Sequence, residues 1–141
     1  MAQFSLRVDP SSAEPLFAQI VSGVKHAVAT GRLAPGDRLP SVRELARELV
    51  INPNTIAKAY DTLESEGVTI SRHGAGTFVA ERRAALSGDE QRRRIREALT
   101  ALLTDAVHLG LRESDVRREF DAALHRFRFD TGGDDAGKRK G

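Results

Sequence analysis

Two helix-start signals lie close together in the segment LPSVRELARELVINPNT. In the first, the Ser41 hydroxyl can accept a hydrogen bond from the Glu44 amide while the Glu44 carboxylate reaches back to the Ser41 amide, which is the arrangement of a capping box. After a short break Asn52 can cap a second helix, and Pro53 suits its first position because proline has no N–H to leave unpaired there. The segment therefore predicts two short helices joined by a tight turn.

The flanking sequence supplies the other elements of a small domain. Apolar residues recur at steps of three and four over residues 15–28, which predicts an amphipathic helix that Gly31 ends. After the second capped helix, apolar residues alternate with others on both sides of a Gly74-Ala75-Gly76 tip, as in a β-hairpin. Three helices and a hairpin over residues 10–80 predict a mostly α winged helix-turn-helix domain with a small β-wing.

The helix that starts at Asn52 has two unlike faces when its residues are placed at 100° steps. The face that we expect to be buried carries Ile56, Ala59, Tyr60 and Leu63. The opposite face carries Asn54, Thr55, Lys58, Asp61 and Thr62. The helix is therefore expected to turn hydrogen-bonding groups outward.

Beyond this domain, residues 81–90 are polar and are expected to form a linker, and residues 91–129 carry two apolar repeats separated at Gly110. The repeat positions are Ile95, Leu99, Leu102, Ala106, Leu109, Val116, Phe120, Ala123 and Phe127. Each repeat is shorter than the roughly three to four heptads of a free coiled coil, so we expect a short C-terminal helical hairpin that dimerises by packing on a copy of itself. Residues 130–141 are small and charged and are expected to be disordered.

Composition narrows the classes of function. The chain has no cysteine, which excludes disulfides and thiolate metal sites, and its N-terminus shows no secretion signal, so we expect a cytoplasmic protein without a membrane segment. The net charge is only +2, so nucleic-acid binding has to depend on where the charges lie. No spacing joins the histidines into a metal set, and the sequence has no P-loop, GxSxG elbow or other catalytic constellation. We therefore expect neither an enzyme nor a cofactor.

The stretch PGDRLPSVRELARELVINPNTIAKAYDTLESEGV, followed by SRHGAGTFV, resembles the N-terminal DNA-binding domain of GntR-family bacterial transcription regulators. The short helical appendage resembles the YtrA-like branch of that family. The resemblance covers residues 10–80 by motif and residues 90–128 by length and pattern. It implies a homodimer that binds an inverted-repeat operator in double-stranded DNA, often near ABC-transporter genes, and usually represses transcription.

Under this resemblance the outward face of the helix that starts at Asn52 meets the major groove. We expect Asn54 and Thr55 nearest the bases, since an asparagine amide can bond an adenine edge and a threonine hydroxyl can meet a base or a phosphate. Lys58 can reach either guanine or the backbone. Asn52 and Pro53 leave the helix N-terminus unobstructed, and we expect its free backbone amides to suit a phosphate.

Further contacts are expected from the preceding helix and from the wing. The resemblance makes Arg43 a DNA contact, and the Ser41 hydroxyl can add a phosphate contact. The expected wing residues are Arg72, His73, Gly74 and Gly76. The two glycines let the backbone approach a phosphate or the minor groove closely.

Simpler explanations exist for these residues. Ser41 and Asn52 suit helix caps alone, Arg43 and Lys58 suit a solvated charged face, and the wing glycines suit any tight hairpin. The alternative function is a protein-interaction module on a winged scaffold, with the cluster Arg92-Arg93-Arg94-Arg96 facing an acidic partner. The short appendage leaves little room for a small-molecule pocket, so the existence of an effector stays open.

One position departs from the resemblance. Relatives commonly have glycine in the turn between the two capped helices, where this chain has Val50. A β-branched residue is costly at positive φ. We therefore expect that the turn avoids this conformation or that the helix pair sits slightly differently.

Overall fold

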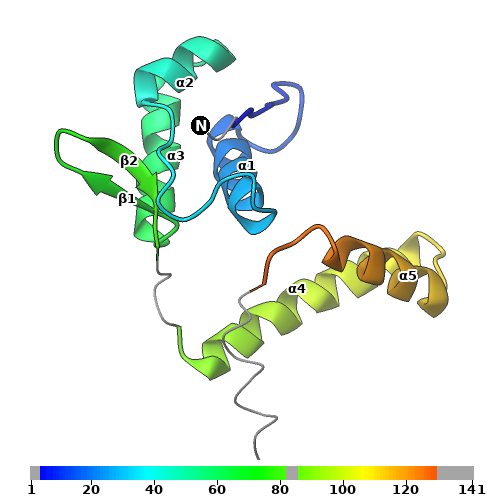
Figure 1. The fold of residues 1–141 in the computed structure, drawn as a ribbon. Coiled ribbons are helices and arrows are strands. Elements are labelled where there is room, and N and C mark those ends of the chain that lie inside the picture. Colours follow the sequence, from blue (N-terminus) through cyan, green and yellow to red (C-terminus); the bar gives the residue numbers. More distant parts are fainter. Residues whose placement is uncertain (1–3, 82–85, 130–141) are drawn as a thin grey trace, which may run out of the picture. The chain divides into compact units, whose positions relative to one another are not determined.

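The computed structural model describes residues 4–81 and 86–129, and in these ranges the chain forms helices and one small antiparallel sheet (Figure 1). The elements are α1 (Leu16–Ala29), α2 (Val42–Leu49), α3 (Pro53–Ser65), β1 (Thr69–Arg72), β2 (Gly76–Val79), α4 (Gly88–His108) and α5 (Glu113–Leu124). The chain divides into two compact units. We call the first, built on α1–α3 and the β1–β2 wing, the N-terminal unit, and the second, built on α4 and α5, the helical hairpin. The order of elements in the N-terminal unit confirms the predicted winged helix-turn-helix.

Both predicted caps of the helix-turn-helix are present. Ser41 Oγ accepts a hydrogen bond from the Glu44 N–H at 3.1 Å, and Glu44 Oε2 accepts one from the Ser41 N–H at 3.3 Å. Asn52 Oδ1 accepts a hydrogen bond from the Asn54 N–H at 2.9 Å, with Pro53 as the first helical residue. Local hydrogen bonds therefore fix where α2 and α3 begin.

The turn between α2 and α3 adopts the conformation that a valine would be expected to avoid. Val50 has φ 55° and ψ 52°, and among the described residues it alone combines a side chain with positive φ. The next amide, that of Ile51, donates to the Ala46 carbonyl at 3.0 Å, as in a Schellman helix end. The expectation that the turn avoids this region is wrong, because the hydrogen-bonded helix end needs a left-handed residue at this position.

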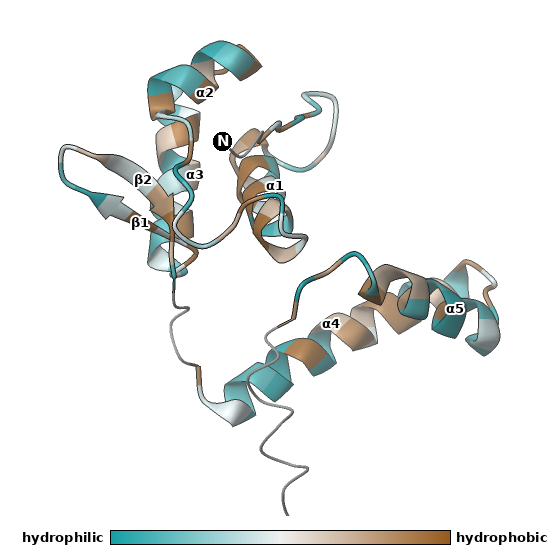
Figure 2. Cartoon of the chain, in the orientation of Figure 1, coloured by the Kyte–Doolittle hydropathy of each residue, from teal (hydrophilic) through white to brown (hydrophobic). Residues whose placement is uncertain are grey.

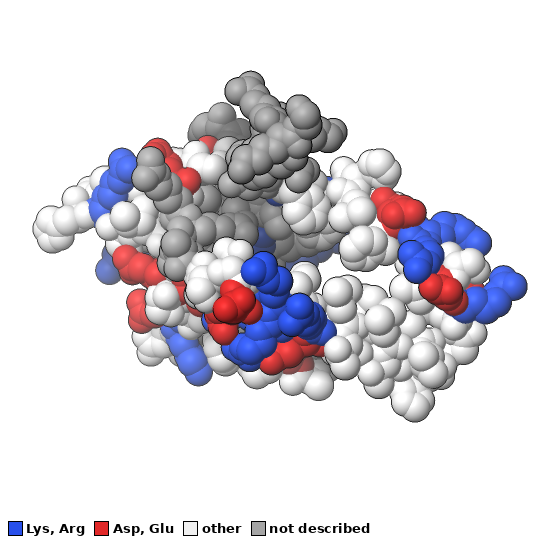
Figure 3. All heavy atoms as spheres, turned by 90° about the horizontal axis from the view of Figure 1, so that it is seen from below, with Lys and Arg blue, Asp and Glu red and all other residues white. Residues whose placement is uncertain are grey.

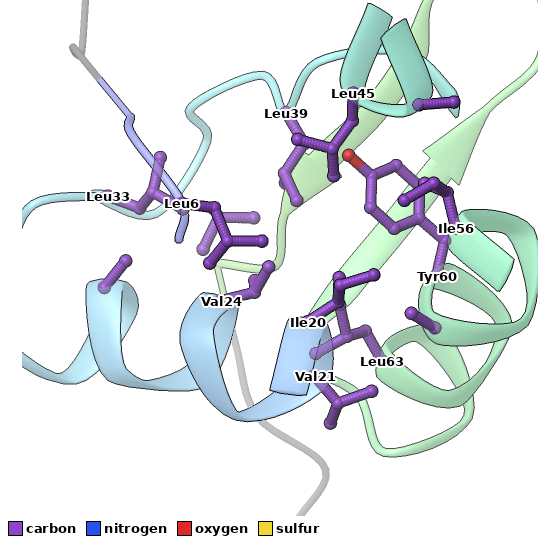
Figure 4. Close-up of a cluster of buried hydrophobic side chains, with 14 residues drawn as sticks. Leu6, Ile20, Val21, Val24, Leu33, Leu39, Leu45, Ile56, Tyr60 and Leu63 are labelled. Carbon is purple, nitrogen blue, oxygen red and sulfur yellow. The ribbon is translucent and has the colours of Figure 1, made fainter. Parts of the chain in front are cut away.

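The apolar core of the N-terminal unit lies between α1 and α3 and is completed by the segments around α2 and the wing. Figure 4 shows Ile20, Val21 and Val24 of α1 and Ile56, Tyr60 and Leu63 of α3 within this cluster. The predicted inner face of α3, including Ala59, is buried throughout. The Tyr60 hydroxyl reaches the edge of the core and donates to the Pro40 carbonyl at 2.7 Å, which links α3 to the residues before α2.

The wing is a two-stranded sheet with a short additional edge. β1 and β2 pair antiparallel, and Arg72 lies opposite Gly76 next to the turn. On the other side of β2, Arg38 forms an antiparallel bridge with Phe78, flanked by two backbone hydrogen bonds of 2.8 Å. The backbone before α2 is therefore held against the wing.

The helical hairpin begins earlier than the sequence pattern indicates. Ser87 Oγ accepts from the Glu90 amide at 3.2 Å and caps α4, so the last residues of the expected linker are helical. Figure 2 shows hydrophobic and hydrophilic residues alternating along α4. Within the described part of this unit, Ala106 is the one buried apolar side chain. The expected disordered tail at 130–141 lies outside the described residues.

Candidate nucleic-acid interface

α3 turns its polar side chains away from the core. Asn54 and Lys58 are exposed, whereas Thr55 is half-buried at the border of the outward face. The helix therefore offers the Asn54 amide, with both donor and acceptor, and the Lys58 ammonium as its most accessible polar groups near the N-terminus.

The backbone amides at the start of α3 are engaged within the protein. Pro53 has no N–H, the Asn54 N–H is capped by Asn52 Oδ1, and the Thr55 N–H donates to the Asn52 carbonyl at 3.0 Å. The expectation of free amides for a phosphate is therefore wrong at these positions, because the Asn52 cap that starts the helix also uses its donors. Recognition from this end of α3 falls to side chains.

Lys58 is held by an aromatic ring on another helix. Its Nζ lies 3.9 Å from the centroid of the Phe17 ring in α1, which is a cation–π contact. The contact draws the ammonium toward the side of α3 that borders α1. The Lys58 ammonium therefore lies at the edge of the polar face of α3, next to α1.

α2 contributes a free cation and an engaged hydroxyl. Arg43 is exposed in the first turn, and none of the ion pairs in the described part of the chain includes it. Ser41 is half-buried and its oxygen accepts from the Glu44 amide, which leaves the hydroxyl hydrogen as a donor. Arg43 is thus available to an anion, and Ser41 is available only as a single donor.

The two wing glycines have different surroundings. Gly74 has φ 74°, and a Cβ placed there would meet nothing within 4 Å, so its backbone is open to close approach. Gly76 has φ 118°, and a Cβ there would lie 2.9 Å from Nε of Arg38. Room for a phosphate therefore exists at Gly74, whereas Arg38 occupies the space at Gly76.

The wing also presents two exposed basic side chains near its turn. The guanidinium carbon of Arg72 lies 5.2 Å from the centroid of the Phe78 ring, and His73 follows Arg72 in the turn.

Arg38 is absent from the set predicted from sequence. Its approach to Gly76 results from the bridge between Arg38 and Phe78, two residues that are far apart in the chain. The signal available in the sequence is only a basic residue in the turn PGDRLP, which does not indicate what that residue contacts.

Comparison with known proteins decides the family. The model of the GntR family of bacterial regulatory proteins matches residues 16–79. The HTH-type transcriptional repressor YtrA of Bacillus subtilis (strain 168) is 39% identical over 106 residues, which cover 75% of this chain and 82% of that protein. The chain belongs to the GntR family.

Solved structures agree with this membership. A transcriptional antiterminator from Listeria monocytogenes EGD-e superimposes with a TM-score of 0.73 at 32% identity, covering 85% of this chain and 90% of that chain. The GntR-family transcription factor YtrA from Sulfolobus acidocaldarius superimposes with a TM-score of 0.55 at 34% identity, covering 67% and 97%. The relatives and the fold of this GntR-family protein are those of DNA-binding transcription regulators, not of enzymes.

The helical hairpin of this GntR-family regulator brings most of the predicted dimerisation positions together. An open groove of about 700 Å³ between α4 and α5 is lined largely by apolar side chains, among them Leu99, Leu102, Ala106, Val116 and Phe120. A second groove of about 390 Å³ adds Leu109 and Ala123. Neither groove is lined by Ile95 or Phe127. The first is also lined by Leu103, Val107 and Leu111, which sequence analysis missed because they fall outside the four-three spacing.

Two of the four arginines in the α4 cluster, Arg93 and Arg94, are engaged by glutamates of their own helix. Arg93 pairs with Glu90 at 2.6 Å and with Glu97 at 2.7 Å, and Arg94 pairs with Glu90 at 3.1 Å. Hydrogen bonds from these two arginines lower the pKa of Glu90 to about 2. The geometry therefore fits a solvated helix face and gives no support to a site for an acidic partner.

Charge on the molecule is mixed in sign. On the face drawn in Figure 3, acidic and basic side chains are interspersed. The chain carries 22 basic and 20 acidic residues, so any preference for DNA depends on where individual cations such as Arg43 lie. Among the described residues, no helix has the length and apolar character needed to cross a membrane.

Proposed function

We propose that the chain is a homodimeric repressor that lays α3 of each subunit in the major groove of an inverted-repeat operator. The observation that carries this proposal is the exposed polar face of α3, where Asn54 and Lys58 are exposed on the side away from a fully buried apolar face. A helix fixed in this way by its core presents hydrogen-bonding side chains to base edges. Two such helices related by a two-fold axis would read half-sites about one helical turn apart.

The side chains divide into two groups by what they can bind. We assign Asn54, with Thr55 beside it, to the bases, because an amide offers the paired donor and acceptor that adenine presents in reverse. We assign Arg43 and Lys58 to phosphates, because Arg43 forms no ion pair with any residue that the structure describes and Lys58 is drawn to the border of α3. Phosphate contacts set register and affinity on any sequence, whereas base contacts set the choice of sequence.

The remaining predicted residues assist from the edges of the site. Ser41 has one hydroxyl donor left for a phosphate, and Pro53 follows the Asn52 cap without an N–H of its own. Arg72 and His73 border the open backbone at Gly74. Their proposed role is to position the wing on the sugar-phosphate backbone.

The helical hairpin supplies the dimer contact in this proposal. Two helices that bury a single apolar side chain between them lack a core sufficient for independent stability. Leu102 is 51% exposed, Val107 is 74% exposed and Leu109 is 76% exposed, and such a patch marks an interaction surface. A second copy has the same patch, and a two-fold axis places the two patches face to face.

Repression and the target genes complete the proposal. The relative from Bacillus subtilis is named as a repressor, which supports the same direction of control here. The expected operator near ABC-transporter genes follows from the family resemblance.

Selection of random duplex sequences by the full chain tests the function. We expect enriched sequences to contain an inverted repeat, with affinity that falls steeply as salt rises. Arg43→Ala should weaken binding on all sequences, and Asn54→Ala should mainly relax the choice of base. Arg47→Ala is the matched control for Arg43, because it removes an exposed arginine one turn later on α2. No enrichment over random DNA at moderate salt would refute the proposal.

Sedimentation equilibrium tests the dimer. Leu102→Glu places a charge in the middle of the apolar patch and should give a monomer that binds half-sites weakly. Ala101→Glu is the control, since Ala101 is exposed on the side of α4 that faces away from Leu102 and Val107 and should leave the dimer intact. Equal association of the two variants would exclude the helical hairpin as the dimer contact.

A further inference from the structure

One face of the wing carries two arginines, Arg72 beside the Phe78 ring and Arg38 beside Gly76. Residues paired across an antiparallel sheet point to the same face, and so do residues two apart on one strand. Phe78 and Gly76 therefore share a face with their partners Arg38 and Arg72. The other face of the wing carries Val79, which is buried in the core.

Arg38 reaches toward the turn end of this face. Its backbone pairs with Phe78, yet its Nε lies 2.9 Å from the position that a Cβ on Gly76 would occupy. Gly76 and its partner Arg72 are the last residue pair before the turn. The side chain of Arg38 thus runs along β2 toward the tip, over a strand position that has no side chain to obstruct it.

In the part of the chain that the structure describes, neither Arg38 nor Arg72 has an ion-pair partner. The carboxylates of Asp37 and Glu44 line the groove beside Arg38, and each is held by a backbone amide, of Ala34 at 2.8 Å and of Ser41 at 3.3 Å, without an ion pair to Arg38. Exposed guanidinium groups held on one face without a counter-charge suit an external phosphate.

We propose that Arg38 is a DNA-backbone contact, which binds a phosphate together with Arg72 on the outer face of the wing. The proposal rests on the function proposed above, in which the wing meets DNA. It gives Gly76 a different role from Gly74: Gly74 leaves the tip backbone open, and Gly76 makes room for the arginine.

The test measures binding of the full chain to a fluorescent duplex of random sequence over a series of salt concentrations. Loss of one phosphate contact makes the slope of log K against log salt shallower by about 0.9, which is about eightfold in affinity at 0.1 M salt. We expect Arg38→Ala and Arg38→Gln to show this change, and Arg38→Lys to keep the wild-type slope. Arg38→Gln retains most of the stem, so a loss that it shares with Arg38→Ala is due to charge.

Arg32→Ala is the matched control. Arg32 is exposed just after the end of α1, and that end of α1 is joined to the C-terminal end of α3 by the Lys25–Glu66 ion pair at 2.8 Å, away from the recognition end. Thermal unfolding of each variant verifies that it is folded. An unchanged slope in Arg38→Gln, or an equal change in Arg32→Ala, would overturn the role of Arg38 while leaving the operator function intact. Failure of the wild-type chain to bind any duplex would instead refute the proposed function.

Discussion

Replacing Val50 by glycine should stabilise the N-terminal unit. Val50 lies at φ 55° and ψ 52°, where an L-residue is strained by about 1–2 kcal/mol. Its side chain is 89% exposed, so its removal sacrifices little packing. Glycine relieves the strain but adds freedom to the unfolded chain, which costs about 0.4–1 kcal/mol. With central values of about 1.5 kcal/mol for the strain and about 0.7 kcal/mol for the added freedom, the net gain in the free energy of unfolding is about 0.5–1 kcal/mol.

Thermal and urea unfolding, followed by circular dichroism, measure this gain. A domain of this size shifts its Tm by about 4–8 °C per kcal/mol, so Val50→Gly should raise Tm by about 2–8 °C with an unchanged urea m-value. Val50→Ala is the control, because alanine keeps the Cβ that causes the strain and should give a much smaller shift. Val50→Asn should fall between them, since asparagine tolerates the left-handed region.

Two results would contradict this reasoning. A loss of stability in Val50→Gly would mean that Val50 contributes packing that its exposure does not suggest. An equal gain in Val50→Ala would mean that the branched side chain, rather than the left-handed backbone, is the source of the cost.

Three further predictions concern other parts of the N-terminal unit. Burial, with smaller contributions from two nearby glutamates, raises the pKa of Tyr60, so above a pH of about 10 the unfolded chain loses the phenol proton before the folded chain does. Raising the pH through this range should therefore lower the free energy of unfolding of the wild type more than that of Tyr60→Phe. At neutral pH, Tyr60→Phe should be about 1 kcal/mol less stable because it lacks the hydrogen bond to Pro40. Thr69→Val should raise the free energy of unfolding by about 1 kcal/mol in urea titrations, because the buried Thr69 hydroxyl has no partner among the described residues. In Glu64→Ala the Ser71 amide, which donates to the Glu64 carboxylate at 3.2 Å, should exchange its hydrogen faster by NMR while distant amides stay unchanged.

The parts of the fold with local signals could be predicted from the sequence. The start of each helix is determined by residues close together in the sequence, Ser41 and Glu44 for α2 and Asn52 and Pro53 for α3. Both helices therefore begin where the capping residues predict. The apolar faces follow from periodicity in the same way. The outward position of Asn54 was predictable because it needed nothing beyond the helix itself.

The parts that depend on distant segments could not be predicted. Arg38 reaches Gly76 only because two remote segments pair, and Lys58 meets Phe17 only because α1 packs beside α3. The left-handed conformation of Val50 also depends on its surroundings and not on its own preference. Local preference argues against its conformation, and the hydrogen bonds and packing of the α2–α3 turn outweigh that preference.

The cap at the start of α3 limits what Asn52 can show to DNA. Its oxygen accepts from the Asn54 amide, and toward the oxygens of a phosphate, which are acceptors only, the side chain can contribute only its NH₂ donors. Aspartate caps a helix as well as asparagine does, yet it would present a negative charge in place of a donor. Under the proposed function, Asn52→Asp is therefore expected to keep the helix and to weaken DNA binding by repelling the phosphates, which would separate the effect of Asn52 on folding from its effect on binding.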